Sequence, residues 1–323
     1  MGPSPPLAMK AVVLDQFGSP DVLTVQDVDA PEAGPGQVRV RVHATSVNPV
    51  DTKIRQQGGD YGLAPPIILG YDVAGVVEAV GDGVDDLRAG DEVFYTPALS
   101  ANGAYAEVHV ADAADVVVKP ASLSFEEAAA IPLAACTAWQ ALVTRCRLEV
   151  GELVLIHGGG GVGHFAVQIA HAAGAEVVVV GNGAMRDTLL DLGADRFVDY
   201  ETGDVEAEVD DLSCGLGANV VFDTVGGDTL AQSVGALAEF GRMATIVGDA
   251  GGGMGAGYRK NATIHTVMMQ RDGGMLDQIA TLVDRGLLRP LVADILPLDE
   301  AAEAHRRIEA GGVGGKLVLT TGA

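Results

Sequence analysis

Cysteine is scarce in this sequence: the 323 residues include only Cys136, Cys146 and Cys214, which lie far apart and form no CxxC pair. An odd and sparse cysteine count argues against a disulfide framework and is typical of a reducing cytoplasm. No apolar run reaches the ~20 residues of a membrane span. The opening MGPSPPLA lacks the basic start and apolar middle of a signal peptide. We therefore expect a cytoplasmic protein without a membrane partner.

Basic residues are also few. The chain has 20 lysines and arginines, only five of them lysines, against 44 acidic residues, and its formal net charge is −24. This balance disfavours nucleic acid, because such binding depends on basic contacts to phosphate. An acid-rich, lysine-poor surface can keep a protein soluble in a salty cytoplasm. Codon bias in an Ala/Gly/Asp-rich genome is the simpler explanation of this acid-rich composition, and both explanations stay open.

Two hydrophobic patterns divide the chain into two predicted domains. In QVRVRVHA (37–44) valines alternate with Arg39, Arg41 and His43, as in a half-buried strand, and similar runs fill the first 120 residues. After a possible helix cap at Ser124 and Glu127, apolar runs such as LVLIH (153–157) and EVVVV (176–180) alternate with helical stretches. This pattern predicts an open parallel sheet with helices on both faces.

The predicted fold class is therefore α/β. An antiparallel, partly barrel-like domain is expected over 1–122 and 269–323, and a parallel-sheet domain over 123–268. The last strand, KLVLTT (316–321), is expected to return to the first domain.

The segment HGGGGVGHFAVQIA (157–170) places four consecutive glycines between an apolar strand and an amphipathic helix. Gly158, Gly160 and Gly163 fit the GxGxxG spacing of a dinucleotide-binding Rossmann fold in its required strand–turn–helix setting. Such glycines make a tight turn, let a pyrophosphate approach bare backbone, and let helix and strand pack closely. The helix start offers unpaired amides to the phosphates. The alternative is a glycine-rich turn without a ligand.

The end of the second parallel strand bears on which dinucleotide binds. NAD enzymes usually carry an acid there that bonds the ribose 2′-OH. This chain has Gly181, Asn182 and Gly183 instead, with Arg186 within reach of a 2′-phosphate. The sequence therefore favours NADP(H), with NAD(H) as the alternative, and Arg186 could equally be a solvated helix residue.

Six sequence blocks together carry a resemblance to a known family: SVNPVDTKIRQQG (46–58), ILGYDVAGVVEAVG (68–81), IPLAACTAWQAL (131–142), the glycine loop, VVFDTVGG (220–227) and GKLVL (315–319). In this order they resemble the medium-chain dehydrogenase/reductase superfamily, in its zinc-free NADPH:quinone oxidoreductase-like branch. The resemblance implies a GroES-like antiparallel catalytic domain, a Rossmann cofactor domain and a cleft between them.

The zinc members of that superfamily hold a catalytic metal with cysteine and histidine ligands, and often a second, four-cysteine site. Here Asn48, Tyr71 and Leu133 stand at the three ligand positions, and no cysteine occurs between Phe94 and Asp112. No metal site is therefore expected. Without a Lewis acid, the easier substrates are quinones or alkenes conjugated to a carbonyl.

The resemblance also implies roles for single residues. Thr137 would lie beside the nicotinamide, and Asn48 would offer its amide near the carboxamide or the substrate oxygen. Tyr61 and Tyr71 are candidate proton donors, each with the alternative of a packed wall residue, and solvent could supply protons to a quinone. Asp51 is expected to bond a nearby turn. The remaining implied cofactor contacts are Gly158, Gly160, Gly161, Val162, Gly163, Asn182, Arg186, Tyr200, Asp223, Thr224, Val225, Gly248 and Lys316.

Three functions stay open at this point. The first is NADPH-dependent reduction of a quinone, and the second is reduction of an α,β-unsaturated ketone, aldehyde or thioester. The third, of a different class, is an NADPH-binding sensor or structural protein with little turnover. A homodimer is expected through the strand near Ala262–Val267, because an unpaired edge strand is a natural seam. The glycine-rich stretch 248–262 would be a mobile lid or a loop.

Overall fold

The computed structural model describes residues 8–100, 102–247 and 254–322, which form two compact units. The first takes in the chain up to Leu133, Arg271–Asp284 and the chain from Pro290; the second takes in Ala134–Gln270 and Arg285–Arg289. The first unit extends past the expected boundary at 122. The reason is helix α2 (Phe125–Ala129), which starts at the expected Ser124–Glu127 capping box and packs on strands of the first unit.

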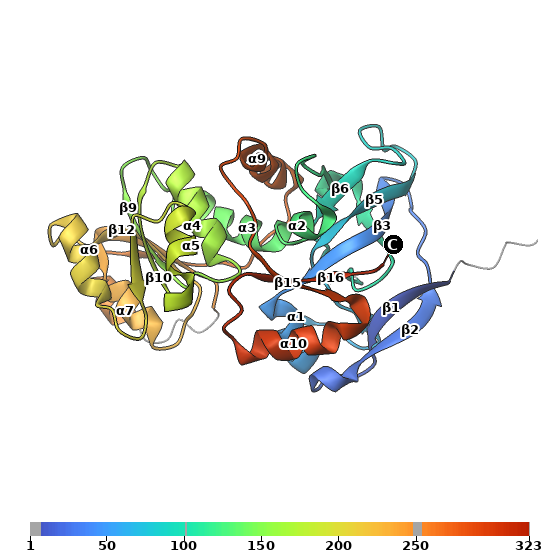
Figure 1. Cartoon of the computed structure of the whole chain (residues 1–323), viewed down its shortest axis with the longest axis horizontal. Coiled ribbons are helices and arrows are strands. Elements are labelled where there is room, and N and C mark those ends of the chain that lie inside the picture. The colour runs from blue at the N-terminus through green and yellow to red at the C-terminus, as the bar shows by residue number, and fades with distance from the viewer. Residues whose placement is uncertain (1–7, 101, 248–253, 323) are drawn as a thin grey trace, which may run out of the picture. The chain divides into compact units, whose positions relative to one another are not determined.

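The first unit is built mainly from antiparallel strands (Figure 1). One sheet has the order β15-β16-β3-β5-β6-β8, with β7 also paired to β3, and a smaller sheet has the order β2-β1-β4. Every pairing is antiparallel except that of β15 with β16. The strands are β1 (Ala8–Leu14), β2 (Leu23–Asp29), β3 (Gln37–Val47), β4 (Ile67–Ile68), β5 (Val73–Val80), β6 (Glu92–Tyr95), β7 (Val108–Asp112), β8 (Val117–Val118), β15 (Val292–Pro297) and β16 (Lys316–Thr320).

Two sequence expectations about this unit are confirmed. Val38, Val40 and Val42 of β3 are fully buried, as the alternation predicted. Strand β16 returns from the end of the chain to pair with β3, with Leu317 opposite Val47. The core therefore joins segments from both ends of the sequence.

The helices of the first unit include α1 (Pro49–Gln57), α9 (Gly273–Asp284) and α10 (Ala301–Ala310). Helix α1 starts where the sequence offers an N-cap, Asn48, followed by Pro49 at the first helical position. Asp51 completes a capping box by accepting a bond from the Asn48 amide at 2.8 Å. Helix α10 contacts α1, and the two helices lie side by side in Figure 1.

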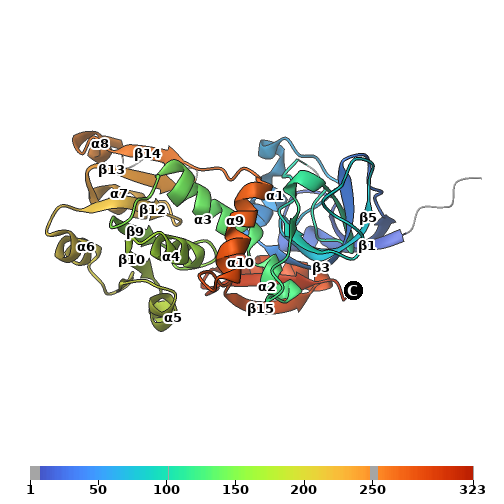
Figure 2. The same cartoon turned by 90° about the horizontal axis from the view of Figure 1, so that it is seen from above.

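The second unit has six parallel strands in the order β11-β10-β9-β12-β13-β14. Figure 2 shows β14, β13, β12, β9 and β10 following one another across this unit. The strands are β9 (Leu153–His157), β10 (Glu176–Gly181), β11 (Arg196–Asp199), β12 (Ala218–Asp223), β13 (Leu237–Thr245) and β14 (Thr263–Thr266). Numbered from β9, the order is 3-2-1-4-5-6, that of the dinucleotide-binding Rossmann fold.

A helix lies between each strand and the next along the chain: α4 (Gly163–Ala172), α5 (Arg186–Asp191), α6 (Val205–Ser213), α7 (Thr229–Gly235) and α8 (Met254–Arg259). Helix α3 (Pro132–Trp139) and a π-helical turn (Gln140–Arg145) precede them. Leu155 of β9 joins a core with residues of α6 and α7, yet its neighbours Val154 and Ile156 are also fully buried. The sheet is therefore covered on both faces, as the continuous apolar strands predicted.

The expected lid or loop at 248–262 is only partly described, since 248–253 lie outside the described residues. Its second half is not a loop: 254–259 form α8, which contacts α7. A Cβ at Gly257 would lie 3.2 Å from the Ile264 side chain of β14, a tight contact, so the small residue suits the packing of α8 on this strand. No helix in the described ranges is long and apolar enough to cross a membrane.

Candidate functional site

Three glycines of the loop between β9 and α4 meet three different physical needs. A Cβ at Gly163 would lie 1.6 Å from the carbonyl oxygen of Gly158, so only glycine lets α4 start this close to the strand. Gly158 has a φ of +97°, which L side chains rarely adopt. A Cβ at Gly160 would meet no atom within 4 Å, so its surroundings are open to a ligand. The loop thus has the geometry of a phosphate cradle, with Gly161 and Val162 as the turn before the helix.

The loop lies at the point where the strand order reverses. β9 and β12 are neighbours in the sheet although β10 and β11 separate them in the sequence. Ligands of open parallel sheets bind at such a switch point, beside the carboxyl ends of the strands. Thr224, which follows β12, donates its hydroxyl to the carbonyl of His157 at 2.7 Å, and its Oγ1 would be 2.2 Å from a Cβ on Gly158. The structure therefore brings two predicted contacts, Gly158 and Thr224, together.

The residues beside Thr224 have different surroundings. The Asp223 carboxylate is fully buried and accepts the amides of Val225 and Gly226, each at 3.0 Å, so it shapes the turn. Val225 is exposed. Thr137 is buried on α3. Gly248 lies outside the described residues. The roles of these residues as cofactor contacts stay predictions.

The end of β10 holds a feature that the sequence analysis missed. Asn182 accepts the amide of Ala184 at 2.9 Å, and the exposed Arg186 places its guanidinium 5.5 Å from the ring of Phe197. A Cβ on Gly183 would lie only 2.4 Å from the Asp199 carboxylate. An acid therefore does reach this loop, but from the end of β11. Tyr200, next to it, is exposed.

A second set of candidate residues is gathered in the first unit, where Asn48, Asp51, Asp72 and Lys316 are all buried. The Lys316 ammonium donates to Asn48 Oδ1 and lies 3.6 Å from Asp72 Oδ2. Asn48 Nδ2 donates to Asp72 Oδ2 at 2.7 Å. These hydrogen bonds fix the orientation of the Asn48 side-chain amide: its oxygen faces the Lys316 ammonium and its nitrogen faces the Asp72 carboxylate.

Asp72 was not among the predicted site residues, although an acid inside the apolar block ILGYDVAGVVEAVG was a signal that could have found it. It also accepts the hydroxyl of Ser46 at 2.5 Å and the amide of Leu133 at 2.7 Å. Burial raises the pKa of Asp72, and the nearby Lys316 charge opposes that rise. Burial lowers the pKa of Lys316, and the charges of Asp72 and Asp51 oppose that fall. Each residue's charged neighbours therefore offset part of the penalty that burial places on its charged form.

Asp51 bonds a nearby turn as expected, since its Oδ1 accepts the amide of Gly70 at 2.9 Å. Its other oxygen accepts the Asn48 amide. Burial is the largest cause that raises the pKa of Asp51, to about 7, and the charge of Asp72 adds to it. This carboxyl therefore exchanges its proton near neutral pH.

The two candidate proton donors differ in exposure. Tyr71 is buried, and burial together with the Asp51 charge raises the pKa of its phenol well above the ordinary value. Tyr61 ends a short 3-10 turn (Gly58–Tyr61) and is 37% exposed. The raised pKa makes the Tyr71 phenol harder to deprotonate, and the assignment of either phenol as the proton donor stays a prediction.

The three positions that carry zinc ligands in zinc-dependent relatives do not offer a zinc donor set here. The amide of Asn48 is bonded to Lys316 and Asp72, Tyr71 presents a phenol with a raised pKa, and Leu133 has an alkyl side chain. In the part of the chain that the structure describes, no three His, Cys, Asp or Glu side chains are grouped to hold a metal.

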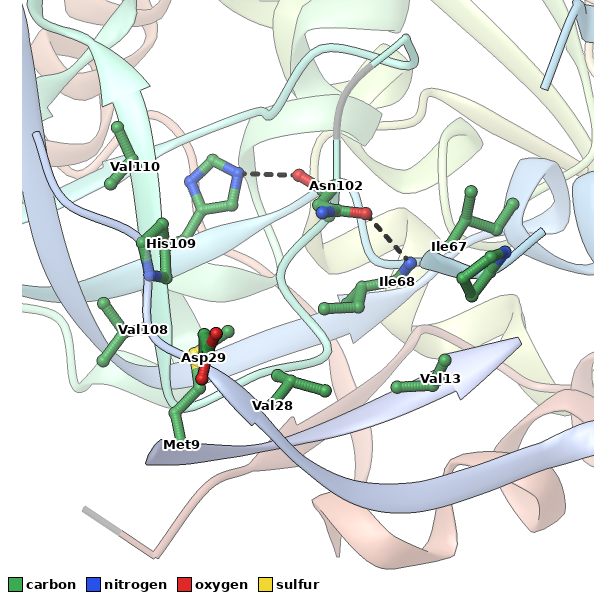
Figure 3. A pocket seen from close by; sticks show the side chains of 13 residues that line it. Met9, Val13, Val28, Asp29, Ile67, Ile68, Asn102, Val108, His109 and Val110 are labelled. Carbon is green, nitrogen blue, oxygen red and sulfur yellow. Dashed lines mark hydrogen bonds between the residues drawn. The ribbon is translucent and has the colours of Figure 1, made fainter. Parts of the chain in front are cut away.

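The first unit also has a groove of about 370 Å³ that contains none of these residues (Figure 3). Its walls are mainly apolar side chains, among them Met9, Val13 and Ile67, and His109 borders it. The ring of His109 is bonded to the carbonyl of Asn102, as Figure 3 shows.

Comparison with known proteins agrees with both units. A family model described as an alcohol dehydrogenase GroES-like domain matches residues 34–121, and one described as a zinc-binding dehydrogenase matches 192–319. The quinone oxidoreductase of Sus scrofa is 34% identical over 325 residues, covering 96% of this chain and 97% of that protein.

Two solved structures extend the likeness. A quinone oxidoreductase from Coxiella burnetii has a TM-score of 0.87 and 33% identity, covering 98% of this chain and 100% of that one. An NAD-dependent alcohol dehydrogenase has a TM-score of 0.91 and 36% identity, covering 97% and 100%. The chain belongs to the medium-chain dehydrogenase/reductase superfamily, in its quinone oxidoreductase-like branch, and is an α/β oxidoreductase with a GroES-like and a Rossmann domain.

Proposed function

We propose that this protein transfers a hydride from NADPH to a quinone without the help of zinc. The observation that carries the proposal is the glycine loop, where Gly163 and Gly158 approach as only glycines can and Gly160 faces open space. These residues fit a dinucleotide diphosphate, whose negative charge is favoured at the start of α4. Bound there, the nicotinamide supplies the hydride. Reduction of a quinone to a hydroquinone then consumes that hydride and one proton.

Zinc independence is part of the proposal. The donor chemistry of Asn48, Tyr71 and Leu133 does not suit zinc, which takes thiolate, imidazole or carboxylate ligands in tetrahedral array. A quinone or conjugated carbonyl already accepts a hydride readily, so its reduction does not require a Lewis acid. Lys316 and Asp72 hold the Asn48 side-chain amide in one orientation. Asn48 would then help to orient the nicotinamide carboxamide or the substrate oxygen.

Steady-state kinetics test this function. The purified protein should oxidise NADPH with a quinone acceptor at a rate that saturates in both reactants, and treatment with a chelator should leave the rate unchanged. Elemental analysis should find no stoichiometric zinc. Tightly held zinc would overturn the metal-free part of the proposal. Saturable NADPH binding without oxidation by any acceptor would favour the sensor or structural protein instead.

The buried Asp51 favours a second candidate function, reduction of an α,β-unsaturated carbonyl compound. That reaction needs a proton on carbon or oxygen after hydride transfer, and a carboxyl with a pKa raised to about 7 holds a proton near neutrality. The same assay with an enone in place of the quinone separates the two functions by their kcat/KM values.

NADP(H) is the proposed coenzyme because β10 ends without an acid of its own and the exposed Arg186 follows it. The Asp199 carboxylate opposes this choice and therefore provides the test. This carboxylate lies beside Gly183 and would repel a 2′-phosphate there. Asp199→Asn should raise the preference for NADPH over NADH by ~10-fold in kcat/KM, on the order of 1.4 kcal/mol. Asn can still accept the Glu201 amide that Asp199 accepts at 2.8 Å, so the turn is retained.

A matched control for this change is Asp210→Asn, which removes an exposed acid from α6 of the same unit. It should leave the coenzyme preference unchanged. An equal effect of the two substitutions would mean that general charge, and not the position of Asp199, sets the preference.

We further propose a homodimer in a reducing cytoplasm. Strand β14 pairs with β13 on one side and forms the end of the six-stranded order, so its other edge can pair with a second copy. Light scattering with a Thr266→Pro variant, which removes an amide donor from the free edge of this strand, tests the seam. The substrate partner is a small quinone or enone, and nucleic acid and membrane surfaces are disfavoured by the net charge of −24.

A further inference from the structure

Strand β14 ends the parallel sheet of the second unit, and no other strand that the structure describes pairs with its outer edge. Figure 2 shows it as the outermost strand of this unit. The amide of Val267, just after the strand, donates to the carbonyl of Thr245 in β13 at 2.9 Å. Because backbone groups alternate in direction along a strand, the amides and carbonyls of Ile264 and Thr266 face outward.

The two faces of β14 carry different side chains. Ile264 packs with the core that α6 and α7 cover, and Gly257 of α8 lies against it. Thr263 and His265 alternate with Ile264, so their side chains lie on the opposite face of the sheet. His265 is only partly buried there. Its ring is therefore open to a neighbour that pairs with the outer edge.

The surroundings of this edge suit a second copy of the chain. Phe240 and Tyr258 are 70% and 86% exposed, the highest values among the described Phe, Tyr and Trp side chains. Phe240 donates its amide to Lys260, which precedes β14. The segment 240–271 has one acid, Asp249, against four basic residues, whereas the whole chain has a net charge of −24. Two such chains repel each other least where their acids are fewest.

Two-fold symmetry restricts how two copies of β14 can pair. A two-fold axis across this edge makes the paired strands antiparallel. In one register Ile264 of each copy lies opposite Thr266 of the other, and all the outward amides and carbonyls of both strands are bonded. A shift that places Thr266 opposite Ala262 loses a bond, because the Ala262 amide already donates to Gly257 at 3.0 Å. In the first register the axis passes through His265.

We propose that two copies pair through β14 in this register, so that the two His265 rings face each other across the axis and must be uncharged for the copies to stay together. Facing residues between the hydrogen-bonded pairs have Cα atoms ~4.5 Å apart, so the two rings bury each other. This inference rests on the proposed homodimer. It adds which residues meet at the axis and the condition under which the copies separate.

Positive charge dominates the face of the sheet that carries His265. Burial lowers the pKa of His265, and the charges of Arg145 and Arg147 lower it further. Arg242 of β13 lies on the same face and forms an ion pair with Glu152. A second protonated imidazole opposite the first would add like charge at short distance. Protonation of the two rings therefore opposes pairing.

Falling pH should dissociate this dimer. The pKa of His265 is lower in the dimer than in the single chain, so the single chain binds more protons and is favoured as the pH falls below its own pKa. Between pH 8 and pH 5.5 the Kd of the dimer should rise by ~10-fold, about threefold for each ring. Protonation of the acidic surface acts in the opposite direction, because it reduces the general repulsion. Sedimentation equilibrium measures the Kd, and His265→Gln should abolish its rise.

His265→Cys tests the register without a change of pH. The two Cβ atoms of such a facing pair are ~4.5–5.5 Å apart, close enough for a disulfide after a small adjustment. The thiol oxidant diamide should therefore convert this variant into a covalent dimer on a gel without reductant. Thr263→Cys and Thr266→Cys are matched controls, because both threonines are exposed on the same strand and neither faces its own copy. Both should stay uncrosslinked, as should the wild type with its exposed Cys214.

The possible results separate this inference from the proposals on which it rests. A single-chain mass at pH 8 would overturn the homodimer and the register together, whereas NADPH oxidation by a quinone is measured independently. A dimer that His265→Cys does not lock, or that Thr266→Cys locks faster, would show that the strands pair in another register. An equal Kd at pH 8 and pH 5.5 would overturn the requirement for uncharged His265 rings.

Discussion

Lys316→Met should destabilise the first unit by about 3–5 kcal/mol, the usual result of leaving buried charges without their partner. Lys316 is bonded to Asn48 and lies near Asp72, and its charge lowers the pKa of both Asp72 and Asp51. Methionine has a similar length, so the change removes the charge with little loss of volume. Urea unfolding at several pH values measures the effect.

The pH dependence of this effect has a definite sign. A carboxyl whose pKa is raised in the folded state binds protons more tightly there, so its contribution to stability is lost as the pH rises through the folded pKa. For Asp51 this window runs from the ordinary 3.8 to about 7. Without Lys316 both acids shift further upward, so Lys316→Met should cost more stability at pH 8 than at pH 5.

Asp72→Asn in the Lys316→Met background is the control for that result. Asparagine removes the uncompensated charge and can still accept the Leu133 amide that Asp72 accepts. The double variant should therefore recover part of the lost stability at pH 8. A single Lys316→Met variant as stable as the wild type at both pH values would contradict an electrostatic role for this lysine.

Gly163→Ala should weaken NADPH binding by ~100-fold or more, about 2.7 kcal/mol, and lower the thermal stability of the second unit. The added Cβ would lie 1.6 Å from the Gly158 carbonyl oxygen, an impossible contact, so α4 and the loop must separate. The amides that would meet the diphosphate then lose their common geometry. Calorimetric titration with NADPH and a thermal melt measure the two effects.

Gly160→Ala separates packing from ligand approach. Its Cβ would meet nothing within 4 Å, so the protein should melt at the wild-type temperature. The methyl group would occupy open space in the cradle, so affinity for NADPH should still fall. If Gly160→Ala left the affinity unchanged, the dinucleotide would not lie against this part of the loop.

The sequence predicted well those features that depend on residues close together in the chain. The glycine loop, the burial pattern of β3 and the capping box at Ser124 are each determined by local spacing, and the structure bears them out. The parallel order of the second unit followed from the strand–helix alternation, which leaves few ways to cover a buried sheet.

The return of the last strand to the first unit was predicted, but several other features that depend on residues far apart in the chain were not. Asp199 reaches Gly183 because β11 pairs beside β10, with Asp199 opposite Gly181, a register that no local pattern states. The place of Asp72 in the buried cluster depends on its contacts with Lys316 and Leu133, which come from distant segments of the chain. The same holds for Tyr105 and His305, whose 200-residue separation hides their pairing.

The bond between Lys316 and Asn48 spans 268 residues, and the whole of the second unit lies within that span. During synthesis, Asp51 and Asp72 emerge long before the cation that accompanies them in the core. The Rossmann unit is complete earlier, by Arg289. We therefore infer that the second unit folds first on the ribosome. The first unit completes its folding last, when strand β16 brings the Lys316 charge beside Asp51 and Asp72.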